Sequence, residues 1–81
     1  MLTDAEARTT IADNVRRLLA ERGMNQRDLA KATGESDMRV SLLCRGERIP
    51  SAAFLARVAE ALEVSADTIL APPPKKSRKT A

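Results

Sequence analysis

Residues 25–46 hold the feature that constrains the fold most, because they encode two short helices joined by a tight turn. The stretch is NQRDLAKATGESDMRVSLLCRG. Asn25 and Ser36 are residue types that start helices, whereas Gly34 and Gly46 are typical of helix ends. The pattern predicts helices at about 26–32 and about 37–45, which meet at the turn around Gly34.

The predicted helix at 37–45 has two distinct faces. At about 100° per residue, Val40, Leu43 and Cys44 fall within one arc, which we expect to face the core. Large apolar side chains also occur on the opposite face, either as stray surface hydrophobics or as contacts for DNA or another protein. Because they occur together on one short helix, contact with a partner molecule is favoured. This outward face carries Met38, Leu42 and Arg45, flanked by Arg39 and Ser41.

Helical spacing continues on both sides of this stretch. Thr3 to Glu6 has the form of a capping box, which predicts a first helix at about 4–22. In the helix at 26–32, Leu29 and Ala32 are expected to point inward. Ser51 opens a fourth helix with an apolar stripe from Phe54 to Leu62, and Ser65 caps a short fifth helix at about 66–70.

The prolines at 72–74 end the folded body, because proline lacks an N–H group and restricts the residue before it. We find no strand alternation and no internal repeat in the sequence. The prediction is an all-α body of five helices at residues 1–71, followed at 72–81 by a Pro-rich, basic, disordered tail.

Composition narrows the functional classes. The 81 residues suffice for one modest core, which must be aliphatic because Phe54 is the only aromatic residue. A single cysteine, Cys44, excludes an internal disulfide and suits a reducing cytoplasm. No apolar run approaches a membrane span, and the acidic start does not resemble a signal peptide. Without His, Tyr or metal-ligand spacing, we expect no enzyme activity, metal or cofactor.

Positive charge is concentrated at the C-terminal end. Residues 1–71 carry ten Lys and Arg against eleven Asp and Glu, a net charge of −1. The last ten residues, PPPKKSRKTA, contribute four basic residues and no acid. Attraction to phosphate must therefore come from local clusters and from this tail, which either binds DNA backbone or serves only solubility.

Taken in order, residues 11–70 resemble the helix-turn-helix domain of phage repressors and Cro proteins, the Cro/C1-type class. The resemblance implies a compact, lambda-repressor-like DNA-binding fold, although this fold also serves antitoxins and other protein-binding modules. The matching segments are Gly23 to Gln26, Asp28 to Ala30, Gly34, Val40-Ser41, Arg45-Gly46, Pro50-Ser51, Ala61 to Ser65, Asp67 and Leu70.

The resemblance also implies roles for particular residues. Gln26 is expected to contact a DNA phosphate at a helix N-terminus, or else simply to begin a helix. Asp37 accepts from a cytosine amino group or only favours the helix dipole. Met38 and Leu42, like Asp37, occupy base-reading positions of the family, and Ser41 is a further candidate for a DNA contact. Arg39, Arg45 and Arg48 are expected as phosphate or base contacts, or else as solvated arginines without a role.

Three positions depart from the family pattern. Leu19 and Cys44 stand where the family often has a paired Arg and Glu, and an apolar contact replaces such a pair without endangering the fold. Cys44 is accordingly expected to be a core residue rather than a reactive thiol. Glu63 occupies the usual position of a glycine, where a left-handed backbone would cost about 1 kcal/mol.

The sequence therefore predicts a dimeric, sequence-specific transcriptional repressor of phage or plasmid type that binds double-stranded DNA. We expect it to be cytoplasmic and associated with the nucleoid. One such domain offers only a small interface, so two copies are expected to pair over a palindromic operator. Ile69 and Leu70 form the dimer contact or belong to the core. The alternative is a protein-binding antitoxin or adaptor that uses Met38 and Leu42.

Overall fold

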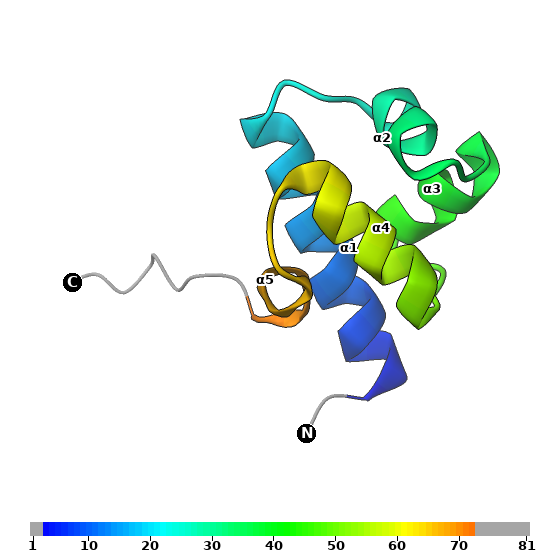
Figure 1. Cartoon of the computed structure of the whole chain (residues 1–81). Helices are drawn as coiled ribbons and strands as arrows, with labels where there is room; N and C mark the ends of the chain where they lie inside the picture. The colour runs from blue at the N-terminus through cyan, green and yellow to red at the C-terminus, as the bar shows by residue number, and fades with distance from the viewer. Residues whose placement is uncertain (1–2, 73–81) are drawn as a thin grey trace.

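Five α-helices and the loops between them make up the structure, a computed structural model that describes residues 3–72 (Figure 1). No strand occurs within that range, and the predicted fold class is confirmed. The predicted basic tail falls mostly outside the described residues. The helices are α1 (Asp4–Glu21), α2 (Gln26–Thr33), α3 (Asp37–Cys44), α4 (Ala52–Leu62) and α5 (Ala66–Leu70).

Each helix begins at a residue whose side chain caps the first turn of that helix. The caps are Thr3, Asn25, Ser36, Ser51 and Ser65, and each side-chain oxygen accepts a hydrogen bond from the backbone N–H three residues later. Such a cap satisfies one of the free N–H groups of a first turn. All five had been predicted as helix starts, and all five are confirmed.

In two helices the C-cap residue itself has a left-handed backbone conformation, a glycine in α2 and a glutamate in α4. Gly34 ends α2 with φ 76°, a conformation that turns the chain sharply toward α3. Glu63 ends α4 with φ 59° and ψ 39°. The left-handed backbone considered for Glu63 in the sequence is therefore present, and the Glu63 carboxylate lies 3.3 Å from the guanidinium of Arg22.

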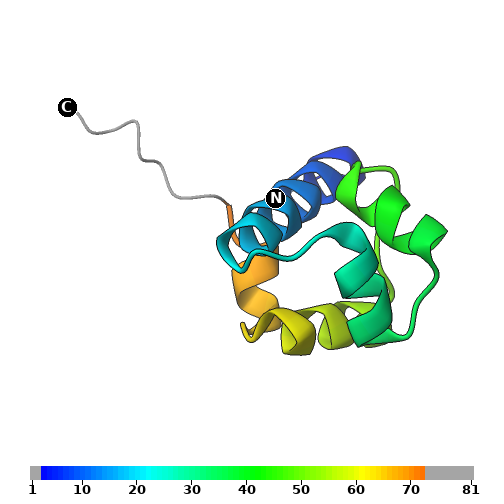
Figure 2. The same ribbon diagram turned by 90° about the horizontal axis from the view of Figure 1, so that it is seen from above.

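Packing centres on α1, which contacts α3 on one side and α5 on the other, while α2 packs against α3 and α4 (Figure 2). The core is aliphatic apart from Phe54, as predicted. The inward prediction for Ala32 is wrong, because the buried arc of α2 runs through Leu29, Ala30 and Thr33 and leaves Ala32 exposed.

A buried polar side chain joins α1 to the C-terminal end of the fold. Asn14 is fully buried, and its side-chain amide donates to the carbonyl oxygens of Ile69 and Ala71, each at 2.7 Å. These bonds satisfy carbonyl groups at the end of α5, which has only five residues and little stability of its own. Ile69 is fully buried and belongs to the core, whereas Leu70 is 42% exposed.

Candidate nucleic-acid interface

The bounds of α3 are fixed at both ends by local contacts. Ser36 Oγ accepts from the backbone N–H of Arg39 at 3.1 Å. After Cys44, the N–H of Glu47 donates to the carbonyl of Leu42 at 2.9 Å, which folds the following loop back beside the last turn. Gly46 has φ 74° and lies close to α1, since a Cβ added there would be 3.6 Å from the Arg8 carbonyl oxygen.

The inner face of α3 follows the sequence prediction. Val40, Leu43 and Cys44 are at most 1% exposed and belong to the hydrophobic core. They seat the helix on α1 and α2. Because this arc is fully used in packing, the residues on the opposite arc are the ones available to a partner.

The outward arc is only partly as predicted. Met38 is 64% exposed, the largest exposure among the large hydrophobic residues described. Leu42 is half-buried rather than fully exposed, as is Ser41.

Charged side chains surround the two apolar residues, and each of three predicted contacts has an ion partner. Arg45 Nε lies 3.5 Å from Glu47, and Asp37 lies 3.9 Å from Arg27 on α2. The Arg27 contact links the first turns of α2 and α3, and Gln26 is exposed at the first position of α2. Arg48 is exposed in the loop after α3.

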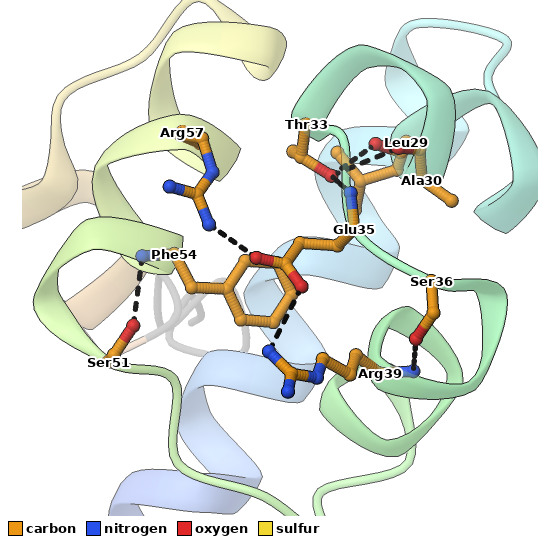
Figure 3. Close-up of polar contacts among 9 residues, drawn as sticks. All are labelled: Leu29, Ala30, Thr33, Glu35, Ser36, Arg39, Ser51, Phe54 and Arg57. Atoms are coloured by element: carbon orange, nitrogen blue, oxygen red, sulfur yellow. Dashed lines mark hydrogen bonds and ion pairs between the residues drawn. The ribbon is translucent and has the colours of Figure 1, made fainter.

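Arg39, the third predicted DNA contact with an ion partner, pairs with a carboxylate that a second arginine also contacts. Glu35, in the turn between α2 and α3, has a side chain only 11% exposed and lies 3.3 Å from Arg39 Nη1. Its second oxygen accepts from Arg57 on α4, so one carboxylate connects α3 to α4 (Figure 3). The i, i+4 spacing of Glu35 and Arg39 was a signal available in the sequence. Nothing in the sequence pointed to Arg57, which is 22 positions away.

Cys44 is a core residue, as expected. Burial raises the pKa of its thiol, and the nearby guanidinium of Arg16 opposes that rise. Arg16 also donates to the backbone carbonyl of Cys44. Leu19, the other position that departs from the family pattern, is 5% exposed, so both positions are filled by packing rather than by an ion pair.

The described residues offer little for other kinds of site. In residues 3–72, no three His, Cys, Asp or Glu side chains are grouped so as to hold a metal ion. The helices in the same range lack the combination of length and apolar character needed to cross a bilayer.

A model of the HTH_3 helix-turn-helix family matches residues 15–69. The crystal structure of the hypothetical transcription factor NHTF from Neisseria is 27% identical with a TM-score of 0.81, covering 90% of this chain and 84% of that one. An HTH_3 family transcriptional regulator from Vibrio cholerae is 31% identical with a TM-score of 0.77, covering 83% of this chain but 38% of its own. No curated protein matches significantly.

Proposed function

The chain belongs to the HTH_3 helix-turn-helix family, and from this premise we propose that it is a dimeric transcriptional repressor of phage or plasmid type. The family and the two structural neighbours support the coarser statement, a DNA-binding transcriptional regulator. The proposal adds that it pairs over a palindromic operator and acts in the cytoplasm, on nucleoid DNA.

The observation that carries the proposal is the division of α3 into two faces. Its inner arc is buried, while Met38 and Arg45 stand exposed on the other arc. A short helix supported from behind in this way has the geometry that major-groove recognition requires. In the proposal, Asp37, Met38, Ser41 and Leu42 face the bases.

The proposed phosphate contacts lie around this face. Gln26 sits at the first residue of α2, where a helix presents free N–H groups and the positive end of its dipole. Arg39, Arg45 and Arg48 supply positive charge, and Arg27 joins them because it lies beside Asp37. For Arg27 and Arg45, both partners of the existing ion pair are exposed, so exchange of that pair for a phosphate contact costs little, at most about 1 kcal/mol.

A salt series tests the proposal. Duplexes selected from a random pool are titrated with the protein by fluorescence anisotropy over a range of KCl concentrations. A repressor gives affinity that falls steeply with salt, and Arg45→Ala reduces the slope of log K against log salt by about one. Arg22→Ala is the matched control, because Arg22 caps the C-terminal end of α1 and pairs with Glu63 at the end of α4, so its loss should leave the slope unchanged.

The exposure of Met38 also favours a second candidate, a protein-binding module such as an antitoxin or adaptor. Such a module would show only weak DNA binding without preference among sequences. Selection that returns no enriched duplex, together with a salt slope unaffected by Arg45→Ala, would exclude the repressor and leave this candidate. Enrichment of a two-fold symmetric sequence would instead support the dimeric repressor.

The proposed dimer contact is now limited to Leu70, because Ile69 is buried in the core. Leu70 is 42% exposed on α5, on the side of α1 opposite to α3. Leu70→Lys is expected to shift sedimentation toward the monomer and to weaken operator binding, while thermal unfolding remains close to that of the parent protein.

A further inference from the structure

The side chains on the outward arc of α3 fall into two groups, those with an ion partner within the fold and those without charge. Asp37, Arg39 and Arg45 each have an ion partner within the fold, at 3.9, 3.3 and 3.5 Å. Met38 and Leu42 are uncharged and lie one helical turn apart. The two apolar residues therefore meet an approaching surface without first giving up a polar contact.

Apolar side chains at a groove surface gain free energy only when they leave water for another apolar group. Among the base edges of the major groove, the apolar group is the C5-methyl of thymine, and a methylated cytosine presents the same group at the same position. Met38 is well suited to such a contact, because its unbranched thioether side chain adapts to the shape of its neighbour.

The spacing of the two residues also fits neighbouring base pairs. Four residues of α-helix rise about 6 Å, whereas successive bases along one strand are about 3.4 Å apart. A helix lying along the groove would bring Met38 and Leu42 over bases one to two steps apart. The deeper position of Leu42 leaves Met38 as the stronger of the two contacts.

Resting on the proposed function, we propose that Met38 and Leu42 recognise C5-methyl groups in the major groove. The operator half-site then carries thymine or 5-methylcytosine at two positions within two base-pair steps. Specificity at these positions comes from the presence of a methyl group rather than from hydrogen bonds to the base edge.

Replacement of single thymines by deoxyuridine tests this inference, because the change removes one methyl group and preserves every hydrogen bond. The probe is the duplex selected from the random pool, with each half-site thymine replaced in turn. Loss of one contacted methyl should raise the Kd about fourfold, from the transfer free energy of one buried carbon group. A cytosine placed at the same position should bind more tightly once it is methylated at C5.

Protein variants then assign each methyl to its side chain. With Met38→Ala, deoxyuridine at the position facing Met38 should no longer raise the Kd, while deoxyuridine at the other position still should. Leu42→Ala should show the reverse pattern. Because Leu42 is partly buried, thermal unfolding must show that this variant is folded, and the exposed Met38 variant decides the question by itself.

The outcomes separate this inference from the function on which it rests. If a selected duplex binds tightly and every deoxyuridine replacement leaves the Kd unchanged, methyl recognition is overturned and the repressor stands. If no duplex is enriched at all, both fail. A methyl effect that disappears only in the matching variant supports the inference.

Discussion

Arg57 on α4 donates to the carboxylate of Glu35, which lies 22 positions earlier in the turn before α3. The same carboxylate pairs with Arg39, so the first turn of α3 is tied to α4 through one nearly buried side chain (Figure 3). Since α3 otherwise packs chiefly on α1 and α2, this link adds a third support to the helix that carries the proposed interface.

Glu35→Gln is expected to lower the free energy of unfolding by about 1 kcal/mol, because it weakens two charge-assisted hydrogen bonds whose acceptor is nearly buried but whose arginine donors are 54% and 44% exposed. Urea denaturation measures the change. Arg57→Gln and the double variant complete a cycle, in which coupling of the two sites is expected. Additive effects would show that the bond between Glu35 and Arg57 contributes nothing.

Asn14→Leu is expected to destabilise the fold by about 2–3 kcal/mol, because it leaves the carbonyl groups of Ile69 and Ala71 without their side-chain donor. The effect should concentrate at α5. Native-state hydrogen exchange would show faster exchange at residues 66–71 than at α2 and α3. Uniform acceleration throughout the chain would contradict a local role for Asn14.

Glu63→Gly should relieve the left-handed backbone at the end of α4, where φ is 59°. The same change removes the ion pair with Arg22, so Glu63→Gln serves as the control that loses the charge and keeps the strain. We expect the glycine variant to be about 1 kcal/mol more stable than the glutamine variant in thermal or urea unfolding. Equal stabilities would mean that the conformation carries no strain.

Cys44 should make stability depend on alkaline pH. Because burial raises the pKa of the folded thiol, the unfolded chain loses this proton first as the pH increases. The contribution is complete below the free-thiol pKa of about 8.5 and declines as the pH rises through the higher folded value. Above that pH, the free energy of unfolding measured with urea should therefore decrease more steeply for the parent protein than for Cys44→Ala. Parallel pH profiles would refute the linkage.

Much of the fold was predictable because its boundaries are decided locally. Thr3, Asn25, Ser36, Ser51 and Ser65 each bond to a backbone group three residues away, a distance at which sequence patterns are informative. The inner arc of α3 was likewise predictable from helical periodicity. On the shorter α2, one misplaced residue, Ala32, shifted the predicted arc.

Contacts between distant segments were not predictable from one sequence. Asn14 lies 55 positions from Ile69, and nothing in its local pattern marks it as a buried residue that holds α5. Glu35 and Arg57 are similar, because their meeting depends on how α2 and α4 pack. The partial burial of Leu42 also follows from tertiary placement. The candidate interface was thus located by sequence, whereas the side chains that brace it were found only in three dimensions.

The serine cap and the glycine turn that bracket α3 have a practical consequence for redesign. Because Ser36 and Gly46 set where the helix starts and stops, the segment between them behaves as an exchangeable cassette. Libraries that vary positions 37, 38, 41, 42 and 45, and retain 40, 43 and 44 as the seat, should present new side chains in an unchanged frame. New DNA-binding specificities can therefore be sampled in this small domain by mutagenesis of one short segment of the gene.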